Sequence, residues 1–307
     1  MDEKKQRLDE FLRSQEGFRT NAFNIIMKML VWWKKTAGSR QFVDELLHSI
    51  FFLGNINIPP YPPEMIFPDE MLNALKKEYP QPFLLYSTHL PRRSPFSCVL
   101  DMIVLQKGQE NENQIIQSLK ALIKTLKPKF LVPSTICVSQ KSVNAVRYYG
   151  VSMSTSGANP GKIMIAASCC NFWDDYVAGA VMTYYPKKVK NSYFDGTIKL
   201  PEDVRCEAFS LCKEERMPPC RSCGNLFGLR TTDTKEWAYG NCAEAESVSK
   251  LLKNEKNVKV QARPTSVTCT EENRQRAKNS VLKELKCVLC MVKFEKWDNH
   301  FYIPQTN

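Results

Sequence analysis

Histidine is scarce in this sequence of 307 residues, and several familiar catalytic motifs are missing from it. Only His48, His89 and His300 are present, and none lies beside a cysteine motif, which argues against a cysteine–histidine nucleophile. The segment SGANPGK at 156–162 lacks the spacing of a P-loop, and no Gly-x-Ser-x-Gly elbow occurs. These absences exclude the best-known signatures of nucleotide hydrolases and serine hydrolases.

Long apolar runs are also missing. The longest, residues 25–33, is interrupted by Lys28 and is too short to cross a bilayer. The first residues, MDEKKQRLDEFL, contain no apolar core of a secretory signal. We therefore expect a cytoplasmic or nuclear protein without a membrane partner, in which the twelve cysteines stay reduced and indicate metal binding or catalysis more than disulfides.

The composition is that of a folded protein with a basic surface. Hydrophobic residues make up 43% and charged residues 24%, and the net charge is 43 − 32 = +11. No long run of Lys or Arg marks a footprint, so the charge predicts only a diffuse field that favours the approach of polyanions. The length predicts two domains, which we place at 1–140 and 141–307.

Hydrophobic periodicity predicts alternating helices and strands. We expect helices at 3–35, 41–52, 69–79, 112–126, 224–229, 242–254 and 270–290. We expect strands at 82–87, 99–105, 147–155, 162–170, 176–186, 203–211 and 258–263, and a proline-rich connector at 58–68. The alternation indicates an α/β fold, a layered α/β/α arrangement around a mixed sheet, with a helix-rich N-terminal region.

The most specific chemical pattern lies between residues 216 and 253. Pro219-Cys220-Arg221-Ser222-Cys223 has the Cys-x-x-Cys spacing that closes on one zinc ion, and Cys242-Ala243-Glu244 places a third cysteine two residues before a carboxylate. Zinc with three protein ligands keeps one position for water and lowers the pKa of that water toward neutrality. A carboxylate in the first turn after a ligand can then move protons without binding the metal.

These two motifs resemble those of the zinc-dependent cytidine deaminase superfamily, which combines a (His or Cys)-Ala-Glu motif with Pro-Cys-x-x-Cys. The resemblance implies zinc held by Cys220, Cys223 and Cys242, with Glu244 as the general acid and base. It implies hydrolytic deamination of cytosine or adenine, of which we favour cytosine, in a nucleoside, a nucleotide or a single-stranded nucleic acid. The motifs cover some 35 residues, so a deaminase-like domain at 141–307 is an extrapolation from them.

The order of the motifs differs from that of the family. The family places Ala-Glu before Cys-x-x-Cys, whereas here Cys223 precedes Cys242 by 19 residues. An alternative ligand pair, Cys287 and Cys290, keeps the usual order, but it lacks the preceding proline and falls late in a predicted helix. We favour the upstream pair and keep the downstream pair as an alternative.

A second function from a different class fits the same residues. Cys220 and Cys223 could belong to a structural zinc site closed by a fourth cysteine, in a protein that binds protein or nucleic acid without catalysis. Candidates for that cysteine are Cys206, Cys212, Cys269, Cys287 and Cys290. The oligomeric state is not predicted.

Three residues before the third cysteine are weaker candidates for substrate binding. Trp237 and Tyr239 could stack on a base, and Asn241 forms the turn that enters the predicted helix. A fainter likeness to a deaminase motif lies at 83–103, where Ser94-Pro95 and Cys98 follow a predicted strand. This segment is either a degenerate, metal-free repeat in the N-terminal region or a coincidence.

Overall fold

The computed structural model describes residues 2–213 and 215–305, with side chains from residue 16 onward. Its helices are α1 (Asp2–Trp33), α2 (Arg40–Asn55), α3 (Pro63–Ile66), α4 (Asp69–Glu78), α5 (Pro80–Leu85), α6 (Pro95–Lys107), α7 (Glu112–Ile123), α8 (Ala158–Asn171), α9 (Asp175–Met182), α10 (Arg221–Phe227), α11 (Ala243–Asn254), α12 (Lys256–Gln261) and α13 (Glu271–Met291). Its strands are β1 (Thr135–Gln140), β2 (Arg147–Val151), β3 (Arg205–Ser210) and β4 (Arg216–Met217). The α/β class predicted from the sequence is therefore confirmed.

The four strands form one sheet in the order β2-β1-β3-β4. All three pairings are antiparallel, with Cys137 opposite Gly150 and Ala208, so the mixed sheet predicted from the sequence is wrong. Hairpins connect β1 to β2 and β3 to β4, and β1 lies between β2 and β3, so no two hydrogen-bonded neighbours among the described strands run parallel. The sheet is small because most of the expected strands are helices.

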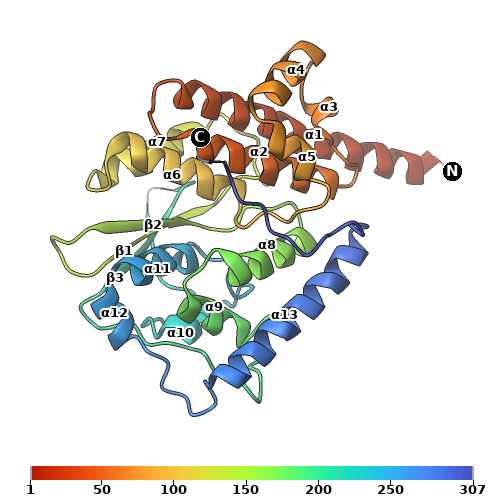
Figure 1. Cartoon of the computed structure of the whole chain (residues 1–307). Helices are drawn as coiled ribbons and strands as arrows, with labels where there is room; N and C mark the ends of the chain where they lie inside the picture. The colour runs from red at the N-terminus through yellow and green to blue at the C-terminus, as the bar shows by residue number, and fades with distance from the viewer. Residues whose placement is uncertain (1, 214, 306–307) are drawn as a thin grey trace.

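Helices contact both faces of this sheet. Neighbouring side chains on a strand point to opposite faces. On one face, Ser139 of β1 hydrogen-bonds Ser247 of α11, with 2.9 Å between the hydroxyl oxygens. On the other, Arg147 and Arg205 pair with Glu112 of α7. In Figure 1 the helices of the first half of the chain gather above the sheet, and α8 to α13 lie below it.

Five of the expected strands are helices in the structure. Residues 82–87 fall largely in α5, 99–105 in α6, 162–170 in α8, 176–186 largely in α9 and its exit, and 258–263 largely in α12. Those in α6, α8 and α9 have a common cause, whereas α5 has only Pro82 buried. A helix buried on nearly all sides has no polar stripe, so its sequence reads like a buried strand. In α8, for example, the residues from Ile163 to Cys169 are all buried.

The other expectations match more closely. The long helices at 41–52, 112–126, 242–254 and 270–290 are α2, α7, α11 and α13, with ends shifted by a few residues. Strands β2 and β3 lie inside the expected ranges 147–155 and 203–211. Helix α1 covers most of 3–35, and the connector at 58–68 contains only the short helix α3. None of the helices that the structure describes has the length and hydrophobicity of a membrane span.

Candidate metal centre

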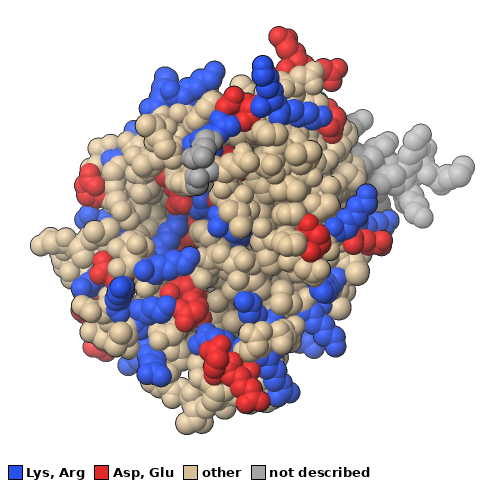
Figure 2. Space-filling model, in the orientation of Figure 1, with Lys and Arg blue, Asp and Glu red and all other residues tan. Residues whose placement is uncertain are grey.

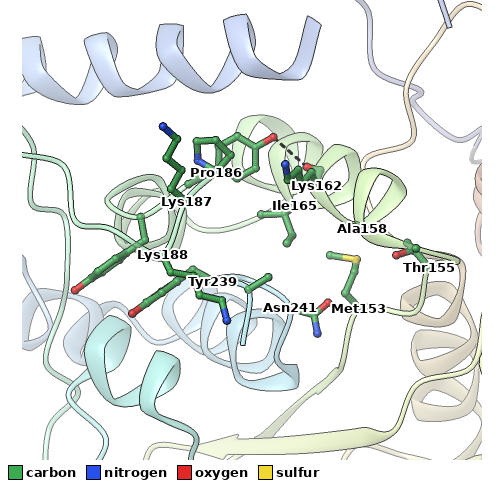
Figure 3. Close-up of a pocket in the computed structure, with 15 residues that line it drawn as sticks. Met153, Thr155, Ala158, Lys162, Ile165, Pro186, Lys187, Lys188, Tyr239 and Asn241 are labelled. Atoms are coloured by element: carbon green, nitrogen blue, oxygen red, sulfur yellow. Dashed lines mark hydrogen bonds between the residues drawn. The ribbon is translucent and has the colours of Figure 1, made fainter. Parts of the chain in front are cut away.

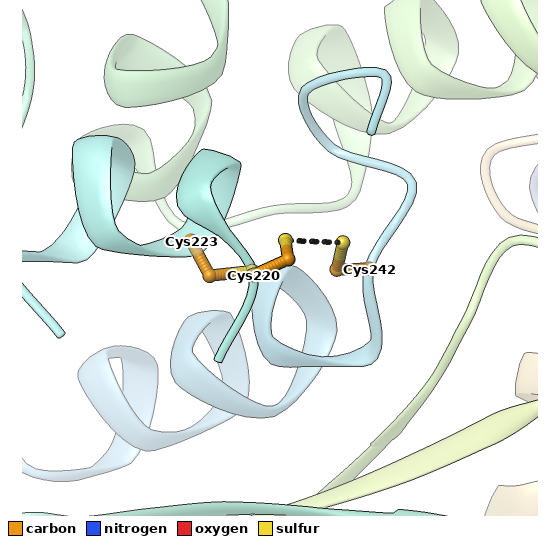
Figure 4. Close-up of side chains that lie close together, drawn as sticks. All are labelled: Cys220, Cys223 and Cys242. Carbon is orange, nitrogen blue, oxygen red and sulfur yellow. Dashed lines mark hydrogen bonds between the residues drawn. The ribbon is translucent and has the colours of Figure 1, made fainter. Parts of the chain in front are cut away.

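Three cysteines from two helix starts converge on one point. Cys220 is the N-cap residue of α10, Cys223 lies in the first turn of that helix, and Cys242 is the N-cap residue of α11. Their sulfur atoms lie within 4.8 Å of one another, and the Sγ atoms of Cys220 and Cys242 are 3.5 Å apart. Figure 4 shows these two sulfurs facing each other between the helices.

The spacing suits a metal ion. Thiolates that bind zinc at about 2.3 Å in tetrahedral geometry lie about 3.8 Å from one another. Cys220 and Cys223 are buried and Cys242 is partly buried, so the site is shielded from bulk water. Both N-cap positions also place sulfur at the positive end of a helix dipole, which favours the thiolate form. The three cysteines are therefore compatible with a metal site, while the identity of the metal is not fixed by them.

The electrostatics of the cluster favour one thiolate even without a cation. Hydrogen bonds from the thiols of Cys223 and Cys242 lower the pKa of Cys220. The same interaction with Cys220 raises the pKa of Cys223 and that of Cys242. The first proton therefore leaves from Cys220, and the remaining two are displaced when a metal binds.

Glu244 lines a small cavity beside the cysteines. This cavity has a volume of about 130 Å³, and its walls include Cys220, Cys242, Trp237 and Asn241. Glu244 is only 5% exposed, and burial raises its pKa to about 7. A carboxyl group that titrates near neutrality can both accept and donate a proton at physiological pH.

The neighbouring carboxylate, Glu246, has a structural role. It is 5% exposed, and its Oε1 accepts a hydrogen bond from Ser97 Oγ of α6 at 2.5 Å. Its Oε2 accepts from the backbone N–H of Val151 at 3.2 Å, and Lys250 Nζ lies 2.8 Å from Oε1. Because Val151 is in β2, Glu246 fixes the start of α11 to both the sheet and α6.

A buried ion network continues from this point into the N-terminal helices. Lys250 Nζ donates to Asp101 of α6 at 2.7 Å, and Asp101 also pairs with Arg93. Arg93 Nη2 in turn lies 2.8 Å from a carboxylate oxygen of Glu45 in α2, and both of these side chains are almost fully buried. Ion pairs among Glu45, Arg93 and Asp101 thus connect the N-terminal helices to α11, which carries Glu244.

Gly150 allows α11 to approach the sheet closely. A Cβ atom at this position of β2 would lie 2.4 Å from the carbonyl oxygen of Ala243 and 2.4 Å from the amide nitrogen of Ser247. Any side chain would therefore collide with the backbone of the first turn of α11. The position of Cys242 and Glu244 therefore depends on having glycine, which has no side chain, at position 150.

The three weaker candidates lie beside this centre in different ways. Trp237 is 46% exposed, and Lys235 Nζ lies 4.1 Å from the centroid of its ring. Tyr239 is buried, and its ring stacks on that of Tyr184 with 3.9 Å between the centroids. One face of the Tyr239 ring is therefore occupied and cannot stack on a base. The backbone carbonyl oxygen of Asn241 accepts a hydrogen bond from the backbone N–H of Met153 at 2.8 Å.

The alternative ligands do not join the cluster. Cys287 and Cys290 lie exposed on α13, and Cys212 is exposed as well. Cys206 instead lies 3.7 Å from Cys137, sulfur to sulfur, and Cys269 accepts a hydrogen bond from Arg274. Within the described part of the chain, no fourth cysteine lies close enough to close the site.

The segment at 83–103 contains no second metal site of this kind. The expected strand is helix α5, and Cys98 is buried in α6. His89 instead groups with Asp298 and His300, with 2.9 Å between His89 Nδ1 and Asp298 Oδ2. That contact joins the C-terminal segment to the segment that follows α5.

Three residues that position the site were not predicted from the sequence: Glu246, Arg93 and Asp101. The spacing of Glu246 and Lys250 is the i, i+4 spacing of a helical ion pair and was a usable local signal. Arg93 and Asp101 had no such signal, because their partners in α2 and α11 are distant in sequence.

No family model, curated protein or solved structure matches the chain.

Proposed function

We propose that the chain is a zinc-dependent hydrolase that removes the exocyclic amine of cytosine. One observation carries this proposal: Cys220, Cys223 and Cys242 converge at two helix starts, and Glu244 lines the same cavity as two of them. A three-thiolate zinc centre supplies a water of near-neutral pKa. No fourth cysteine closes the site in the described residues, which favours this open centre over a structural one.

Each residue would have a separate task in this reaction. The thiolates of Cys220, Cys223 and Cys242 would hold the metal. Glu244 would take one proton from the attacking water and pass it to the ring nitrogen of the base. It would then take the second proton, from the new hydroxyl on the ring carbon, and pass it to the exocyclic amine, which leaves as ammonia while the carbon keeps the oxygen as a carbonyl. Trp237 forms part of the cavity wall, where its indole could contact the base.

The size of the cavity favours the base alone over a whole nucleotide. Its volume of about 130 Å³ is well below the ~300–1,000 Å³ of typical ligand pockets. The cavity therefore suits a nucleobase, with the rest of the substrate outside it.

The three-layered, deaminase-like architecture belongs to the same proposal. Helix α11 with Cys242-Ala243-Glu244 packs on one face of an antiparallel sheet, and α10 with the Cys-x-x-Cys pair follows β3 and β4 in the chain. The two ligand helices meet at the three cysteines although their order along the chain is reversed relative to the family.

A pair of glutamine variants tests the reaction. Glu244→Gln should keep zinc and fold but reduce deamination by about 10²–10⁴-fold, because general acid–base catalysis is lost. Glu246→Gln is the matched comparison: it removes a nearby buried carboxylate that supports α11 but does not line the small cavity, so it should lower thermal stability and reduce deamination much less than Glu244→Gln does. Ammonia release from cytidine and CMP measures activity. Full activity in Glu244→Gln would refute the mechanism.

A further inference from the structure

A second and larger cavity adjoins the candidate metal centre. It has a volume of about 400 Å³ and is formed by the start of α8, the segment after α9 and the turn before α11. Asn241 lines both this cavity and the small one, and it directly precedes Cys242 in the chain. Asn241 therefore belongs to the walls of both spaces, and Figure 3 shows it beside the larger one.

The larger cavity is basic. Lys162, Lys187 and Lys188 are among its lining residues, which include no aspartate or glutamate. Lys188 Nζ donates to the carbonyl oxygen of Glu236. None of the three lysines forms an ion pair with the residues that the structure describes, although the chain has many such pairs elsewhere, as between Lys190 and Asp195. Unpaired ammonium groups around a cavity favour an anionic occupant.

The start of α8 adds to this field. Its N-cap residue is Gly157, with φ of 101°, and no side chain caps the helix. The first turn contains no acidic residue, and Pro160 has no N–H to donate. Gly157 and Ala158 line the cavity, so the positive end of the helix dipole faces the same space as the lysines.

The remaining walls are apolar and aromatic. Met153 and Ile165 lie on one side, and Tyr184 and Tyr239, stacked at an interplanar angle of 6°, lie on another. Figure 3 shows Met153, Ile165, Tyr239 and Asn241 around the space, with lysine side chains at its edge. A sugar can contact such walls while its phosphate lies near the ammonium groups.

We propose that this cavity binds the phosphate of a nucleotide whose base occupies the small cavity beside Glu244. The proposal rests on the proposed deamination and narrows its substrate class to phosphorylated nucleosides, either free mononucleotides or residues of a single strand. Lys162 and Lys187 are the phosphate ligands that distinguish these substrates from a free nucleoside. On the face shown in Figure 2, acidic and basic side chains are interspersed, so this face has no broad basic surface.

Binding measurements test this site apart from catalysis. Zinc-loaded Glu244→Gln protein would be titrated by calorimetry with CMP, cytidine and a short oligodeoxycytidine. We expect CMP to bind at least about tenfold more tightly than cytidine, since charge-assisted hydrogen bonds to phosphate are lost in the nucleoside. Lys162→Ala and Lys187→Ala, made in the same background, should each reduce CMP affinity by about tenfold and leave cytidine affinity unchanged.

Lys190→Ala is the matched control. Lys190 lies on the same segment, but its ammonium group is paired with Asp195 at 2.5 Å and it does not line the cavity. It should not change CMP affinity. Equal affinities for CMP and cytidine, or insensitivity of CMP binding to both lysine variants, would overturn the proposal.

The same titrations separate the two sources of phosphate and the two proposals. Tighter, lysine-dependent binding of the oligonucleotide than of CMP would support the site with a single strand as substrate, and the reverse would support it with a mononucleotide. Lysine-dependent CMP binding without deamination by the wild-type protein would retain the phosphate site and reject the proposed reaction. Deamination of cytidine and CMP at equal rates, unaffected by the lysine variants, would retain the proposed reaction and reject the phosphate site.

Discussion

Replacement of Gly150 by alanine should displace the helix that carries two of the four candidate catalytic groups. The new Cβ would meet the backbone of Ala243 and Ser247 at 2.4 Å, whereas ordinary contact begins at about 3.4 Å. The first turn of α11 or strand β2 must therefore move by 3.4 − 2.4 = 1.0 Å. Neither neighbouring atom belongs to a flexible side chain that could turn away.

The displacement has two measurable costs. Overpacking of this kind destabilises proteins by about 1–3 kcal/mol, which lowers the melting temperature of a protein of this size by roughly 1.5–5 °C. Zinc sites tolerate ligand distances within about 0.2 Å, so a movement of 1.0 Å at Cys242 should reduce zinc affinity at least about tenfold. Activity of the zinc-loaded variant should fall by up to about 10²-fold, because Glu244 is misplaced by the same distance.

Gly161→Ala provides the control. A Cβ at Gly161 of α8 would meet only the hydroxyl oxygen of Thr155, at 3.3 Å, and alanine favours the helix by about 1 kcal/mol. This variant should match or exceed the wild type in melting temperature and keep its zinc affinity. Competition with a chromogenic chelator and differential scanning fluorimetry measure both. Wild-type stability and zinc affinity in Gly150→Ala would refute the close packing of α11 on β2.

Three further predictions concern the buried ion network, pH and the metal. Arg93→Met should destabilise the protein by about 3–5 kcal/mol in urea denaturation, because it leaves the buried carboxylate of Glu45 with only Arg92 as partner; a loss below 1 kcal/mol would contradict a structural role for the network. Burial lowers the pKa of His48 to about 3, so the unfolded chain gains a proton below pH ~6.5 that the folded one does not, and stability is lost on acidification. The wild type should therefore lose about 1.5 kcal/mol more of its free energy of unfolding than His48→Phe does between pH 6.5 and 5. Comparing the two proteins removes the opposing effect of Glu244, which is present in both. If the difference between them does not change with pH, His48 is protonated in the folded protein. Removal of zinc by a strong chelator should lower the melting temperature by several degrees, reversibly on addition of zinc, whereas an unchanged value would mean that no metal is bound.

The sequence predicted the elements with clear periodicity and missed those without it. Helices α7 and α13 have a polar face opposite a buried stripe such as Ile115, Leu119 and Leu122, and their positions follow from that pattern. The residues of α8 are buried on nearly all sides, so their composition carries no period that distinguishes a helix from a strand. Burial by distant segments decided the structure there.

The candidate site divides in the same way. The Cys-x-x-Cys spacing is local, so a ligand pair at 220 and 223 could be predicted. Which pair accompanies Cys242 depends on the path of the chain, and the structure brings Cys220 and Cys223 to it while Cys287 and Cys290 lie on α13. The segment at 156–162 was rejected as a P-loop by its spacing, and its proximity to Lys187 could not be seen before the fold was known.

The coordination of the metal is the most direct test of an open three-cysteine centre. X-ray absorption at the zinc edge of the purified protein should show three sulfur atoms at about 2.3 Å and one oxygen at about 2.0 Å. Replacement of Cys242 by serine should reduce the sulfur number to two or abolish binding. Four sulfur ligands, or zinc whose sulfur number does not change in the Cys242→Ser variant, would contradict the account.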